Sequence, residues 1–191
     1  AYYKEKPERV LEKELSMLSV VCPVYNEADN IERLLDELRT KVSVPMDVLI
    51  VYDRDDDNTL PVVYKIADKY PFKIKLIKNN YGHGALNAIK TGFEKSQNEA
   101  VLVVMADLSD DLTVVDEMYH LITVEGYDIV CGSRYMPGGR QIGGPIIKRT
   151  LSRLAGISLH YLTGLPTHDV TNSFKMYSQK IIKEFKIESK G

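Results

Sequence analysis

The sequence predicts a single-domain α/β fold with a mostly parallel central sheet flanked by helices. Short apolar runs alternate with amphipathic stretches along most of the 191 residues, as they do in helix-flanked parallel sheets. Four of the five strand ends in this alternation carry polar or charged residues, at the edge where such sheets bind ligands. Hydrophobic residues make up 44% of the chain and charged residues 27%, which argues against a disordered tail or a coiled coil.

The first predicted strand is the uninterrupted apolar run Leu18–Val24, which suits a strand buried on both faces. Apolar residues then recur at the spacing of one helix face, at Ile31, Leu34, Leu35 and Leu38. Asp29 or Asn30 is available as the N-cap of this helix.

The same alternation continues along the chain. Further strands are predicted at residues 48–52, 74–77, 100–105, 128–131 and 169–177. Further helices are predicted at residues 62–70, 84–93, 114–122 and 146–162. Pro61 fits the first turn of the second helix, and Leu86, Ile89 and Phe93 are expected to face inward in the third.

Charge, cysteine content and apolar run length narrow the class of protein. The net charge of −2, from 25 basic and 27 acidic residues, argues against a nucleic-acid-binding face. The two cysteines, Cys22 and Cys131, lie in predicted buried strands, which excludes a disulfide framework and favours a reducing compartment. No apolar run reaches the ~18 residues of a membrane span. Residues 1–17 are predicted to be a charged arm and residues 18–191 the folded domain, truncated at its C-terminus.

Aspartates directly follow two of the predicted strands, at Asp53 and Asp107. A hard divalent cation such as Mg²⁺ or Mn²⁺ needs one or two carboxylates together with substrate phosphates, and Asp107 is well placed for that role. Arg134 and Arg149 are candidate cationic partners of the phosphates. Together these residues predict a nucleotide-phosphate site that holds a metal ion.

Other polar residues near the strand ends have structural explanations. Aspartate favours turns and helix N-caps, which accounts for Asp56, Asp57, Asp110 and Asp111. The segment Gly82-His83-Gly84 before a helix favours a plain turn, because it lacks the spacing of phosphate-binding loops.

An ordered set of motifs makes the chain resemble a known family. Residues 21–27, VCPVYNE, resemble the opening VxxPxYNE of family 2 glycosyltransferases with the GT-A fold, and residues 106–109 resemble their DADLQ metal motif. The later segments GSRY, KR and DVTNSFK follow the order found in dolichol- and polyprenol-phosphate sugar transferases, typified by dolichol-phosphate mannose synthase. The resemblance covers residues 18–180 and implies transfer of a sugar from a nucleotide-diphosphate donor.

This resemblance also implies site residues by position. The implied nucleotide-binding residues are Pro23, Tyr25, Glu27, Asp53, Ala106 and Asp107. Asp107 and Ser109 match the positions that bind Mg²⁺ or Mn²⁺. Arg134 and Arg149 match residues that contact the phosphates, and Asp169 matches the aspartate at the reaction centre.

The chain departs from the family pattern at several positions. Met105 stands where the family has the first aspartate of its metal motif, and Ser109 stands where it has glutamine. Asp110 or Asp111 is a candidate to replace the carboxylate that is absent at Met105. These departures support one alternative, a degenerate domain that binds a nucleotide without turnover.

The predicted function is metal-dependent transfer of a sugar from a GDP- or UDP-sugar to a polyprenyl or dolichyl phosphate, in the cytoplasm at the membrane face. The acceptor phosphate is already an anion at neutral pH, so a strong general base is less necessary than for a hydroxyl acceptor. The apolar helix 146–162 is expected to lie towards the lipid. A transferase with a glycan or soluble hydroxyl acceptor stays open, with Asp169 as a true base. A response-regulator-like signalling domain would explain the acidic strand ends but not the series Arg134, Arg149 and Asp169.

Overall fold

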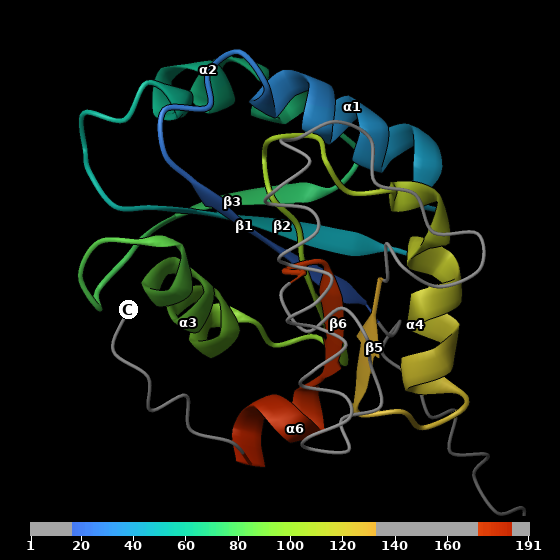
Figure 1. The fold of residues 1–191 in the computed structure, drawn as a ribbon. Helices are drawn as coiled ribbons and strands as arrows, with labels where there is room; N and C mark the ends of the chain where they lie inside the picture. The colour runs from blue at the N-terminus through green and yellow to red at the C-terminus, as the bar shows by residue number, and fades with distance from the viewer. Residues whose placement is uncertain (1–16, 133–171, 185–191) are drawn as a thin grey trace, which may run out of the picture.

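The computed structural model of the chain describes residues 17–132 and 172–184. Within these residues six strands form one sheet, with the spatial order β3-β2-β1-β4-β6-β5 (Figure 1). The strands are β1 (Leu18–Val24), β2 (Met46–Tyr52), β3 (Lys73–Lys78), β4 (Ala100–Val103), β5 (Ile129–Cys131) and β6 (Lys175–Ser178). The first four strands are parallel, and β6 lies antiparallel between β4 and β5. The predicted mixed α/β fold with a mostly parallel sheet is therefore confirmed.

Helices cover both faces of this sheet. They are α1 (Ile31–Lys41), α2 (Thr59–Ile66), α3 (Ala85–Lys95), α4 (Val115–Thr123) and α6 (Gln179–Glu184), with short 3₁₀ turns at Ala67–Lys69 and Leu112–Val114. Figure 1 shows α1 and α2 on one side of the sheet and α3 on the other. Successive β1 residues point to opposite faces, so Val20 packs in the core under α1, α2 and α4 while Val21 packs under α3.

The third helix packs against the sheet partly as predicted. Phe93 is buried and the half-buried Ile89 packs against the same core, as expected, whereas Leu86 is only half-buried. Ala88 and Gly92, which were not expected there, are also buried against the sheet. A Cβ atom added at Gly92 would lie 2.2 Å from Cγ1 of Val21, so glycine permits the close approach of α3 to β1. A search for large apolar residues misses this contact, because glycine and alanine form this part of the buried helix face.

Two element boundaries and the side-chain contact of one helix cap also differ from the predictions. The second helix begins at Thr59 and ends at Ile66, where a 3₁₀ turn continues to Lys69. The last strand was predicted at residues 169–177. Within the described residues it comprises only Lys175–Ser178, because only these residues pair with β4 and β5. Asn30 occupies the N-cap position of α1, but its side chain donates to the Glu27 carboxylate at 2.8 Å instead of capping the helix.

Several other sequence predictions can be compared with the described residues. Cys22 is buried and Cys131 half-buried, and both are free thiols, as expected for a chain without a disulfide framework. Among the described helices none is both long enough and apolar enough to cross a bilayer. The charged arm at residues 1–16, the helix at 146–162 and its preceding loop lie outside the described residues.

Candidate active site

A cleft of about 410 Å³ opens at the carboxyl edge of the sheet. It is lined by Pro23, Val24, Tyr25, Glu27, Asp53, Gly84, Ala85, Ala88, Met105, Ala106 and Asp107. All six residues expected to bind a nucleotide are in this set, although they come from three separate segments of the sequence. The structure therefore brings the predicted nucleotide-binding residues together at one place.

Strand register explains why these segments meet. Val24 pairs with Tyr52 at the ends of β1 and β2, so Tyr25 and Asp53 leave the sheet side by side. On the other side of β1, the Val104 N–H donates to the Val21 carbonyl oxygen at 3.0 Å, which carries β4 to the same edge. Parallel strands end together, and the polar residues that follow them must gather at the common edge.

Asp53 is held by the turn that follows β3. Its carboxylate accepts hydrogen bonds from Asn79 Nδ2 at 2.7 Å and from the Gly84 N–H at 2.8 Å. The side chain is only 11% exposed, and His83 Nδ1 lies 3.7 Å from Oδ2. Gly82 and Gly84 have φ angles of +96° and +112°, which glycine adopts without strain. The structure shows the turn expected at Gly82-His83-Gly84, and Asp53 ties this turn to the end of β2.

Asp107 lies in a loop whose shape is set by its own carboxylates. Asp107 Oδ1 accepts from the Ser109 N–H at 3.0 Å, and Leu108 between them has a φ angle of +61°. Left-handed backbone is uncommon for a residue other than glycine and is concentrated at functional sites. Asp107 itself is exposed and lines the cleft. The loop thus presents this carboxylate to solvent at the edge of the sheet.

The two following aspartates build the loop. Asp110 Oδ2 accepts from the Met105 N–H at 3.1 Å. Asp111 Oδ1 accepts from both the hydroxyl and the N–H of Thr113, and these hydrogen bonds hold the pKa of Asp111 below its usual value. Both side chains thus make the turn and cap interactions expected of them. Neither lines the cleft, so the structure does not favour them as substitutes for the carboxylate replaced by Met105.

The cleft is electrostatically negative on its described side. Burial raises the pKa of the Cys22 thiol beneath it, and the nearby carboxylates of Glu27, Asp110 and Asp107 raise it further. Cys22 is therefore a protonated core residue. No lysine or arginine is among the described residues that line the cleft. Such a site favours cations, or anions that arrive together with a cation.

A divalent ion fits the donor set at this edge. Within residues 17–132 and 172–184 no three His, Cys, Asp or Glu side chains are grouped as a complete metal site. One exposed carboxylate beside a cleft is nevertheless the arrangement that Mg²⁺ or Mn²⁺ uses when phosphate oxygens supply further ligands. Asp107 meets this condition, and Ser109, two residues further on, is also exposed.

Arg134, Arg149 and Asp169 lie outside the described residues, so their expected roles remain predictions. Sequence reasoning did not assign Gly84, Ala85 and Ala88 to the cleft. The sequence does contain an indication of this role, since a Gly-x-Gly turn followed by small residues begins the helix after the third strand. Small side chains there leave room for a ligand close to the backbone.

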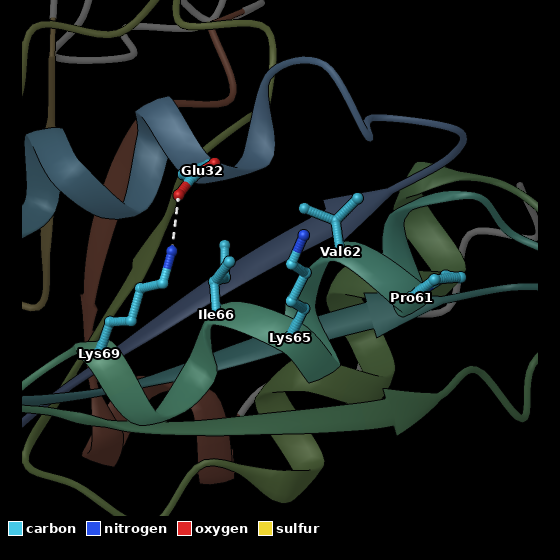
Figure 2. A pocket seen from close by; sticks show the side chains of 6 residues that line it. All are labelled: Glu32, Pro61, Val62, Lys65, Ile66 and Lys69. Atoms are coloured by element: carbon cyan, nitrogen blue, oxygen red, sulfur yellow. Dashed lines mark hydrogen bonds and ion pairs between the residues drawn. The ribbon is translucent and has the colours of Figure 1, made fainter.

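A second hollow, of about 340 Å³, lies between α1 and α2 (Figure 2). It is lined by Glu32, Pro61, Val62, Lys65, Ile66 and Lys69, and it shares no lining residue with the cleft. Lys69 Nζ lies 3.4 Å from Glu32 Oε1 across it. None of the residues predicted to bind nucleotide, metal or acceptor borders this hollow, so the cleft at the strand ends is the candidate active site.

Comparison with known proteins gives a consistent result. The family described as Glycosyl transferase family 2 matches residues 19–186. A dolichol-phosphate mannosyltransferase of Pyrococcus furiosus is 28% identical over 137 residues, which are 71% of this chain and 38% of that protein. A polyprenol monophosphomannose synthase of Mycolicibacterium smegmatis is 24% identical over 177 residues, which are 90% of this chain and 66% of that protein.

The fold has close counterparts among solved structures. A mannosyltransferase from Pyrobaculum calidifontis in complex with GDP-Man and Mn²⁺ superposes with a TM-score of 0.60 at 17% identity. The match covers 87% of this chain and 46% of that one. The chain thus has the GT-A fold of these transferases, and it spans less than two thirds of the length of each relative compared above.

Proposed function

The chain belongs to glycosyl transferase family 2, and from this membership we propose that it transfers a sugar from a nucleotide-diphosphate donor to a polyprenyl phosphate. The observation that carries the proposal is the single cleft that collects Pro23, Tyr25, Glu27, Asp53, Ala106 and Asp107. Its volume of about 410 Å³ falls within the range of small-molecule sites, about 300–1,000 Å³. Two relatives carry names that include dolichol phosphate and polyprenol, and such polyprenyl lipids are the acceptors in this proposal.

The donor would bind with its base beside the β1 and β2 exits and its diphosphate towards the β4 exit. Tyr25 is 63% exposed and can stack on a base, while Glu27 can accept from a ribose hydroxyl. Asp53 would act partly through the turn that it holds, because its carboxylate already accepts two hydrogen bonds. The diphosphate would then reach Asp107, the exposed carboxylate of the cleft.

Asp107 and Ser109 would hold Mg²⁺ or Mn²⁺ together with the donor phosphates. The bound ion would neutralise charge that develops on the departing diphosphate. Arg134 and Arg149 would add hydrogen-bonding cations to the same leaving group. In this arrangement Met105 contributes no ligand, so the ion depends on one protein carboxylate and on the donor itself.

The transfer would be a displacement at the anomeric carbon. The acceptor phosphate arrives as an anion, so the chain has to orient it rather than deprotonate it. Asp169 would perform this orientation. The proposal places the reaction at a membrane face, since a polyprenyl chain is confined to a bilayer.

A thermal-shift panel of GDP- and UDP-sugars, each with and without Mn²⁺, tests donor binding. A ligand at one hundred times its dissociation constant stabilises the folded state by roughly 2.7 kcal/mol. We expect at least one nucleotide sugar to raise the melting temperature, and Mn²⁺ to increase the shift. An absence of any shift across the panel would contradict the proposal.

Met105 favours one further candidate, a domain that binds nucleotide sugars without turnover. It lines the cleft beside Asp107, where a thioether replaces a hard oxygen ligand. This candidate predicts the same thermal shifts but no transfer to any acceptor. Donor consumption over time therefore separates the two.

A further inference from the structure

Two loops at the rim of the cleft are joined by hydrogen bonds between their backbones and side chains. The Asn26 N–H donates to both carboxylate oxygens of Asp57, at 3.1 and 3.2 Å. The Glu27 N–H donates to the Thr59 hydroxyl oxygen at 2.9 Å. The first loop leads from β1 to α1 and the second from β2 to α2. We call this set of bonds between residues 26–28 and 57–59 the loop junction.

Asp57 is the central residue of the loop junction. It is only 4% exposed, and its carboxylate also accepts from the Thr59 N–H at 2.8 Å. A buried carboxylate needs such donors to offset the loss of hydration. Its neighbour Asp56 has the same chemistry in a different setting, since it is exposed and pairs with Arg54 at 2.7 Å.

Two of the hydrogen bonds that Asp57 accepts come from a residue with an uncommon backbone conformation. Asn26 has a φ angle of +58°, in the left-handed region that few residues other than glycine adopt, although asparagine does so more readily than most. Tyr25 precedes Asn26 and Glu27 follows it, and both line the cleft. A change in the Asn26 backbone would therefore redirect both cleft residues at once.

The hollow between α1 and α2 lies next to the loop junction at Glu32 and Pro61 and extends along α2 to Lys69 (Figure 2). Hydrogen bonds in the loop junction are direct connections at this end of the helix pair.

We propose that Asp57 is a positioning residue of the donor site, which holds Asn26 in its left-handed conformation so that Tyr25 and Glu27 face the nucleotide. The proposal rests on the proposed function, because it assigns these two side chains to a nucleotide. Asp57 does not line the cleft, so it would act through the β1–α1 loop and not by contact with the ligand.

The test compares Asp57→Asn with the matched control Asp56→Asn in the full chain. An asparagine amide cannot accept on its nitrogen, so Asp57→Asn loses part of the loop junction while keeping its size. We expect the dissociation constants of UDP or GDP with Mn²⁺, measured by calorimetry, and the donor KM to rise ~10- to 100-fold, with a much smaller change in kcat. Asp56→Asn should leave all three within about twofold. A lower melting temperature with unchanged nucleotide affinity would overturn the proposal.

A second measurement needs no nucleotide. Amide hydrogen exchange at Asn26 and Glu27 should become at least ~10-fold faster in Asp57→Asn and should not change in Asp56→Asn. Unchanged exchange in Asp57→Asn would overturn the loop junction even if the protein proves to be a transferase. A wild-type protein that binds neither UDP nor GDP would instead refute the proposed function, while exchange still decides whether Asp57 orders the loop.

Discussion

Carboxylates at the strand ends have separate tasks, and burial and hydrogen bonding distinguish them. Asp57 is buried and joins two loops, Asp53 holds the turn before α3, and Asp111 caps a 3₁₀ turn. Asp107 is the exposed carboxylate that faces the cleft. The four side chains look alike in the sequence, and only their partners show which is available to a metal ion.

Asp107→Asn should weaken metal-dependent donor binding by at least ~10-fold, because a neutral amide is a poorer ligand for a hard cation. Calorimetry with UDP or GDP and Mn²⁺ measures the effect. Asp111→Asn is the matched control in the same loop. It should change stability little, because asparagine caps a turn about as well as aspartate, and it should leave nucleotide affinity unchanged. Equal affinity in wild type and Asp107→Asn would remove Asp107 from the metal site.

At the scale of elements, the packing of α3 on β1 depends on a residue without a side chain. Gly92→Ala should destabilise the protein by about 1–3 kcal/mol, because the new methyl group would overlap Val21. Urea denaturation measures the change in the free energy of unfolding. Val21→Ala should relieve part of the cost in the double variant. If the two substitutions are simply additive, Gly92 and Val21 are not in the close contact described.

Strand β6 carries a titratable group that should make stability depend on pH. Burial raises the pKa of Tyr177 to about 12, and the nearby Cys131 adds to the shift. The unfolded tyrosine ionises near pH ~10, so stability from the neutral hydroxyl is complete below that pH and is lost as the pH rises towards 12. As the pH rises from below 10 to above 12, wild type should therefore lose up to roughly 2 kcal/mol more of its free energy of unfolding than Tyr177→Phe loses. A difference that does not vary with pH would contradict this burial.

Much of the fold could be predicted because buried parallel strands leave a simple pattern. The run Leu18–Val24 is β1 to the residue, and α1 begins at the first apolar position of its periodic face. The antiparallel insertion of β6 between β4 and β5 could not be predicted, because pairing partners leave no local signal. For the same reason the cleft residues were identified by motif, whereas the hydrogen bond from the Asn26 N–H to Asp57 required the structure.

On the scale of the whole molecule, the two edges of the sheet have different tasks. At the amino edge Asp47 is buried and accepts from Ser19 Oγ at 2.8 Å, Lys75 Nζ at 2.6 Å and Asn98 Nδ2 at 2.9 Å. These partners lie on β1, on β3 and just before β4. The amino edge is thus tied together by a polar network, which leaves the carboxyl edge free to be shaped by loops.

Asp47→Ala should reduce the free energy of unfolding by about 2–4 kcal/mol, since three donors lose a buried acceptor. Nucleotide affinity should stay within about twofold in the molecules that remain folded, because the network lies at the edge opposite the cleft. Chemical denaturation and calorimetry on the same preparation check both parts. A large loss of affinity at unchanged stability would show that the two edges are coupled.

Donor-dependent transfer, with a polyprenyl phosphate and the matching polyprenyl alcohol offered side by side, tests the central claim most directly. Each donor that shifts the melting temperature should be supplied with Mn²⁺, and the glycolipid product quantified over time. We expect product from the phosphate and none from the alcohol, because only the phosphate arrives as an anionic nucleophile. Transfer to the alcohol or to a soluble hydroxyl, or donor binding without any transfer, would contradict the account.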